Sequence, residues 1–275
     1  MRRIRIAIIF GSEPNFDRYA FKYFILSVNK IQNTFEFSFP DATMFPFEEG
    51  IVNFNESTEI ASNFINQNGW KADSFISIIT NRFDNNWFFK AAPNISIITT
   101  NIWEKYFSPP SLFEYLLHSI YSCLIRTKIL PDGRHIEKDL LTMDFSSHKD
   151  TRGCINDFTR QKYDDKIDIA LGYICEEHSS KIKQFYGEDY FKDMQFILGR
   201  EWIGNIEEKN TVAYNLKHVF KFNINKDSGF NKNFWDKIKD KFYEIPGSLV
   251  GDAIKVVMTA LLTYLLIKWG IVKIK

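Results

Sequence analysis

Short β-branched runs that alternate with amphipathic stretches constrain the fold of this chain more than any other feature. Ile4–Phe10 is mostly Ile, Ala and Phe, and Gly11 and Ser12 end it, a pattern typical of a buried strand. Such alternation predicts an α/β (α+β) fold, in which helices pack on a mixed sheet. The other predicted strands are Phe35–Phe39, Ser74–Thr80 and Ile95–Thr100, and the predicted helices between them are Asp17–Asn29 and Glu56–Asn66.

A further helix is predicted from Leu112 to about Thr127. Ser111 and Glu114 have the spacing of a capping box, and the two prolines before Ser111 occupy positions that a helix start tolerates. One stripe of this helix is apolar and predicts burial against the sheet. It consists of Phe113, Leu116, Leu117, Ile120, Cys123 and Leu124.

Charge and cysteine content exclude several classes of protein. The 275 residues include 35 Lys and Arg against 34 Asp and Glu, so no global field steers the chain to nucleic acid or to an acidic membrane. Three cysteines are too few for a disulfide scaffold and suit a reducing cytosol. Ile4–Phe10 is too short for a signal peptide, so we expect the body of the protein in the cytoplasm.

His148, Cys154, Cys175 and His178 form the strongest chemical signal. Two sulfur and two nitrogen donors match the tetrahedral preference of zinc, and a site with four protein ligands is structural because no position stays open for water. The spacing from Cys175 to His178 lets one turn or helix start supply two ligands, and Gly153 permits the turn that directs Cys154. We therefore expect a structural zinc site.

A simpler interpretation of these residues stays open. Cys154 and Cys175 would then be small buried apolar residues, and His148 and His178 would lie on the surface.

Several stretches of the chain resemble the archaemetzincins, zinc peptidases with an HExxHxxGxxH helix followed by a cysteine-rich zinc knuckle. The resemblance covers roughly residues 4–180 and implies a metzincin-like sheet with an active-site helix and a knuckle over 146–180. Phe75–Asn81 is similar to the strand before the edge strand, Ile95–Thr100 to the edge strand, Phe113–His118 to the approach to the active-site helix, and Thr151–Phe158 with Cys175–His178 to the knuckle. His178 stands where the family usually has a cysteine.

The catalytic motif of the family is not present on this helix. His118 matches the first zinc ligand, but Ser119 replaces the general base and Ser122 the second ligand. Ile125 replaces the glycine and Lys128 the third ligand. The resemblance therefore implies a peptidase scaffold without peptidase chemistry, and His118 is expected to be a histidine in or near the core.

Two further segments each have two interpretations. Asp164–Asp168 is acidic, and we expect it to be a solvated helix start rather than a catalytic group. Lys217–Lys241 is Lys-rich with interleaved aromatic residues, which suits either contact with a phosphate-bearing ligand or an ordinary amphipathic helix.

The last segment, 246–275, is the most apolar of the chain. Val256–Ile267 holds twelve residues without a charge, whereas a membrane span needs about 20 apolar residues. A helix from Leu249 to Ile274 reaches that length but must accommodate Asp252, Lys255 and Lys268. Lys268, Lys273 and Lys275 are long enough to extend to the interface. Burial in protein is the alternative. The residues expected to face the membrane are Val256, Leu261, Leu262, Leu265, Leu266 and Trp269.

These observations predict three parts: 1–180 as a degenerate metzincin-like domain, 181–245 as an α+β extension, and 246–275 as the apolar helix. We expect a non-enzymatic effector or sensor of the toxin or antiviral-defence type. It would form a homo-oligomer at the inner membrane, with its terminal helices packing into a pore, and would respond to a small ligand, an oligonucleotide or a partner protein. The alternatives are a divergent zinc metallopeptidase and a soluble scaffold or ligand-binding module.

Overall fold

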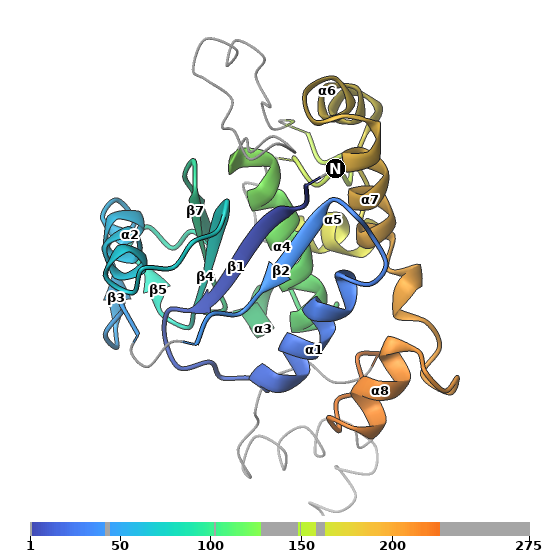
Figure 1. The fold of residues 1–275 in the computed structure, drawn as a ribbon, viewed down its shortest axis with the longest axis horizontal. Coiled ribbons are helices and arrows are strands. Elements are labelled where there is room, and N and C mark those ends of the chain that lie inside the picture. Colours follow the sequence, from blue (N-terminus) through green and yellow to red (C-terminus); the bar gives the residue numbers. More distant parts are fainter. Residues whose placement is uncertain are drawn as a thin grey trace, which may run out of the picture. The chain divides into compact units, whose positions relative to one another are not determined.

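A five-stranded mixed sheet is the centre of the computed structural model (Figure 1). Its order is β2 (Phe35–Ser38), β1 (Ile4–Phe10), β4 (Ser74–Ile79), β7 (Ile95–Thr99) and β6 (Phe89–Ala91). β2, β1, β4 and β7 are parallel, and β6 is antiparallel to β7. The predicted α/β class with a mixed sheet is confirmed. The structure describes residues 2–41, 45–101, 103–127, 148, 150–157 and 163–225.

The edge of the sheet differs from the expectation drawn from the archaemetzincin resemblance. Ile95–Thr100 was expected at the edge, but β7 is internal, between β4 and β6, and all five of its residues are buried. The edge strand on this side of the sheet is β6, whose three residues are half-buried. So short a strand carries little periodicity, which is why the sequence did not reveal it.

The two faces of the sheet are covered by different helices, as period-two alternation requires. Ile6 and Ile8 of β1 belong to one apolar cluster, which includes α1 (Arg18–Val28) and α4 (Leu112–Thr127). Ala7 and Ile9 belong to a second cluster, which includes α2 (Ser57–Gln67). Shorter elements are β3 (Ile51–Val52), β5 (Arg82–Phe83) and α3 (Trp103–Tyr106); β3 and β5 pair with each other.

α4 is fixed at its start by the predicted capping box. The Ser111 backbone N–H donates to the Glu114 carboxylate at 2.8 Å, and the Glu114 N–H donates to Ser111 Oγ at 3.4 Å. One turn on, the buried Tyr115 hydroxyl donates to the carbonyl of Thr99 at the end of β7 at 2.9 Å. The helix is thereby held against the carboxyl end of the neighbouring strand.

The described part of 181–245 is helical, so the α+β expectation for that segment is not met in residues 181–225. It contains the end of α6 (Glu176–Tyr186), then α7 (Glu188–Gly199), a 3₁₀ turn (Glu201–Ile203) and α8 (Val212–His218). Tyr186, Tyr190, Met194 and Ile197 recur at helical spacing and are buried. They belong to the same cluster as β1 and α4, so the core is continuous across residue 180.

The predicted C-terminal helix over 246–275 and the end of the Lys-rich stretch lie outside the described residues. Within the ranges that the structure describes, no helix is both long enough and apolar enough to cross a membrane.

Gly172 is the residue after α5 (Asp165–Leu171), where the chain turns toward Cys175, and a substitution there tests this turn. Its φ is +54°, and a Cβ there would overlap the carbonyl oxygen of Leu198. We expect Gly172→Ala to lower the free energy of unfolding by about 2 kcal/mol or more, because both the left-handed backbone and the close approach resist a side chain. Urea denaturation measures this.

Gly199→Ala is the matched control, since Gly199 ends α7 with open space around its Cα. Equal stability of the two variants would show that Gly172 does not control this turn.

Candidate metal centre

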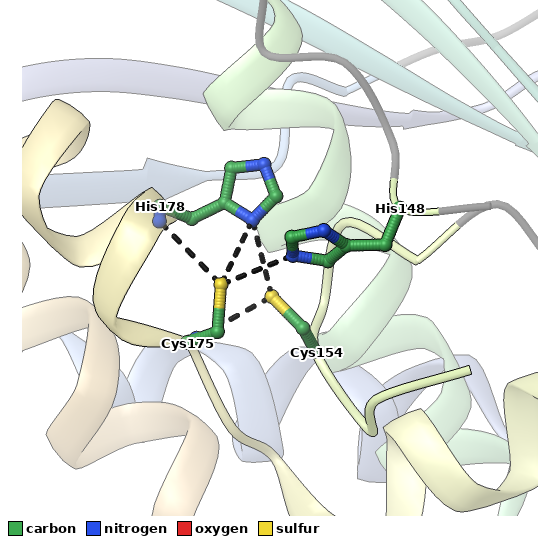
Figure 2. A group of neighbouring side chains, drawn as sticks. All are labelled: His148, Cys154, Cys175 and His178. Atoms are coloured by element: carbon green, nitrogen blue, oxygen red, sulfur yellow. Dashed lines mark hydrogen bonds between the residues drawn. The ribbon is translucent and has the colours of Figure 1, made fainter. Parts of the chain in front are cut away.

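Four side chains from three chain segments meet in one buried cluster (Figure 2). His148 and Cys154 come from irregular chain stabilised by isolated bridges, His148 to Asp157 and Cys154 to Tyr173. Cys175 is the N-cap of α6, and His178 lies in the first turn of that helix. The structure therefore brings together all four residues that the sequence predicted.

The donor atoms are spaced as a shared ion requires. The Nε2 atom of His148 lies 3.1 Å from Cys175 Sγ, and the Nδ1 atom of His178 lies 3.2 Å from Cys175 Sγ and 3.4 Å from Cys154 Sγ. One ligand atom from each of the four residues lies within 4.8 Å of all the others. Around tetrahedral zinc, sulfur and nitrogen ligands are about 3.6 Å apart, so a small contraction or expansion of this cluster suffices.

The backbone of the knuckle also directs the sulfur atoms. Gly153 has a φ of +76°, as the predicted turn before Cys154 requires. The Cys175 N–H points to Cys154 Sγ at 3.4 Å, and the His178 N–H points to Cys175 Sγ at 3.5 Å. The start of α6 thus supplies two ligands and N–H donors that favour negative charge on sulfur.

Burial contradicts the part of the simpler interpretation that places the histidines on the surface. His178 is fully buried and His148 is 7% exposed, so neither is a surface histidine. Burial raises the pKa of the Cys154 thiol to about 12, so a thiolate at this position needs a cation beside it at neutral pH. This group can hold a metal ion with all four positions supplied by protein.

His118 lies apart from this cluster, on α4. It borders a cavity of about 20 Å³, roughly the space of one water molecule, together with Ser119 and Ser122. Its Nδ1 atom has no hydrogen-bond partner among the described residues. Burial, then the charges of Arg126 and Arg200, lower the pKa of His118 to about 3, so the ring is neutral. In the part of the chain that the structure describes, no second set of His, Cys, Asp and Glu ligand atoms converges there.

The acidic stretch over Asp164–Asp168 is a helix start, but the expected solvation is wrong. Asp165 and Asp168 are 8% and 2% exposed and border the same cavity as His118, together with Asp157. Burial, then the charges of Asp157 and Asp165, raise the pKa of Asp168 to about 8. A protonated Asp168 can donate to Asp157, whose Oδ2 atom accepts from the Cys154 N–H at 3.1 Å. These carboxyls therefore connect α5 to the metal cluster.

Sequence reasoning did not identify Asp157 and Asp168 as neighbours of His118. They lie in a polar segment without periodicity, so no pattern marks them as buried. Glu114, predicted as a carboxylate in the first turn of α4, also forms a 2.6 Å ion pair with Arg200, and the sequence analysis did not predict this pair.

Asp168→Asn tests the buried carboxyl. The folded state keeps this proton up to pH 8 or so, whereas an unfolded chain releases it near pH 4. In that window the folded state binds more protons than the unfolded state, so the contribution of Asp168 to stability falls as pH rises. We expect the Tm of the unsubstituted protein, relative to Asp168→Asn, to fall between about pH 5 and pH 8.

Asp189→Asn is the control, because it replaces an exposed aspartate that lies outside the buried group of carboxyls. A Tm difference for Asp168→Asn that does not change with pH would contradict the raised pKa.

No family model matches the chain, and neither the curated proteins nor the solved structures contain a significant match to it. The function is therefore argued from the geometry of the site.

Proposed function

We propose that the cluster of His148, Cys154, Cys175 and His178 holds a structural zinc ion. The observation that carries this proposal is the convergence of two sulfur and two nitrogen donors within 4.8 Å in a buried site. Zinc prefers this ligand set, and four protein ligands leave no position for a substrate or a reactive water. Zinc in this site acts by holding the chain together.

The role of such an ion follows from where its ligands lie. The segment around His148 and Cys154 has only isolated bridges to its neighbours, whereas Cys175 and His178 belong to α6. A bound ion joins the irregular segment to that helix, and α6 in turn packs on α7. Because the unfolded chain has no preformed site, metal binding contributes directly to folding.

Zinc content tests this proposal. We expect about one zinc ion per chain in protein purified without chelator, and loss of that ion in Cys154→Ala, because three ligands hold zinc much more weakly than four. Elemental analysis measures the content, and thermal unfolding with and without a chelator measures its effect on Tm.

Cys123→Ala is the matched control, since Cys123 is equally buried but lies on α4, outside the cluster. Zinc-free protein with an unaltered Tm in chelator would overturn the proposal.

We further propose that the chain is a non-enzymatic effector or sensor built on a degenerate metzincin-like domain. On α4, serines stand at the base and second-ligand positions, and His118 is neutral and half-buried. The apolar segment 246–275 supports attachment to the inner membrane, and oligomerisation would gather several such segments into a pore. The toxin or antiviral-defence setting and a regulatory ligand or partner are part of this proposal and rest on the sequence alone.

A divergent zinc metallopeptidase is the second candidate function. One observation favours it: the His118 Nδ1 atom has no hydrogen-bond partner in the described part of the chain, and it lies in a cavity that Asp157, Asp165 and Asp168 also border. Peptide hydrolysis that is lost in His118→Ala would establish this candidate and remove the first.

Removal of residues 247–275 tests the membrane proposal. We expect the full-length chain to sediment with membranes and to release dye from liposomes, and the chain ending at Pro246 to do neither, because the apolar segment supplies the contact area. Fractionation and dye release measure this. A full-length chain that stays in the soluble fraction and leaves liposomes intact would support the scaffold alternative instead.

A further inference from the structure

The two histidines of the cluster present different ring nitrogens to the sulfur atoms (Figure 2). His178 approaches both sulfurs with Nδ1, whereas His148 approaches Cys175 Sγ with Nε2. The remaining nitrogen of His148 is Nδ1. A neutral imidazole that ligates through Nε2 carries its proton on Nδ1, so this atom needs an acceptor.

Glu177 is the side chain that faces this nitrogen. Its Oε2 atom lies 3.9 Å from His148 Nδ1 and 4.0 Å from Arg152 Nη1. Its other oxygen, Oε1, is 2.9 Å from Lys181 Nζ, one turn further along α6. The carboxylate is therefore held between two cations, with one oxygen directed to the ring. A shift of about 1 Å would turn the 3.9 Å approach into a hydrogen bond.

We propose that Glu177 is the positioning carboxylate of the metal centre and fixes His148 as an Nε2 ligand. The inference rests on the proposed metal centre and adds to it a mixed ligand set: two thiolates, Nε2 of His148 and Nδ1 of His178. A carboxylate that accepts the Nδ1 proton sets the tautomer and the ring orientation and makes the ligating nitrogen a better donor. His148 needs this support most, because it comes from irregular chain whereas His178 is fixed on a helix.

Glu177 also has an ordinary explanation as a surface partner of Lys181. It is half-exposed, and exposed pairs of this spacing contribute little to stability. That explanation predicts that Glu177→Ala behaves like Lys181→Ala and that neither changes metal affinity. The positioning role predicts a difference between them.

Competition for zinc against a chromophoric chelator separates the two explanations in the full chain. We expect Glu177→Ala to weaken zinc binding by about 10-fold or more, and Glu177→Gln by less, since the amide oxygen still accepts a hydrogen bond. Glu176→Ala is the matched control, because Glu176 lies in the same turn of α6 but faces solvent. Equal zinc affinity in Glu177→Ala and Glu176→Ala would overturn the proposal.

Imidazole nitrogen NMR of the zinc-loaded chain supplies a readout that a general loss of stability would not move. We expect a protected proton on His148 Nδ1 in the unsubstituted protein and faster exchange of that proton in Glu177→Ala. A proton on His148 Nε2 would contradict the assignment of Nε2 as the ligand. Absence of zinc from the unsubstituted protein would instead refute the metal centre itself, so the two failures are distinguishable.

Discussion

Two cysteines and two histidines meet in one buried cluster, and this contact joins the irregular chain around His148 and Cys154 to the start of α6. Residues 148–157 contain isolated bridges and no described helix or strand of their own. Backbone hydrogen bonds, such as the one from the Ile155 N–H to the Tyr173 carbonyl at 2.9 Å, hold part of this segment, and the four side chains of the cluster add contacts to the start of α6. Two of them stand at the start of α6, which is buried against the same core as the sheet.

The metal cluster and α4 are linked by a buried polar layer. Asp157 accepts the Cys154 N–H on one side and borders the His118 cavity on the other. Across that cavity, Arg126 of α4 supplies positive charge, and Asp168 of α5 is a carboxyl whose pKa burial raises to about 8. At its α4 end this polar layer meets His118, whose ring is neutral and half-buried.

The parallel strands of the five-stranded sheet and the four residues of the cluster could be predicted from the sequence because their signals are local or chemically specific. Ile4–Phe10 has the composition of a strand buried on both faces, and the Ser111 and Glu114 pair defines the start of α4 within four residues. Cysteines and histidines at short spacings have few common roles, so their convergence was expected.

Other features depend on tertiary structure and left no pattern in the chain. β6 has three residues, too few for a period, and its role as the edge follows only from pairing with β7. Asp165 and Asp168 were predicted to be solvated because acidic residues usually are. They are buried because α4 packs against α5. The helical nature of α7 was obscured by aromatic residues, which are common in strands too.

X-ray absorption at the zinc edge of the full chain tests the central claim most directly. The account predicts two sulfur ligands at about 2.3 Å and two nitrogen ligands at about 2.0 Å, with no bound water. A shell of nitrogen and oxygen ligands alone would place the zinc outside this cluster, and an open position taken by water would contradict a closed structural centre.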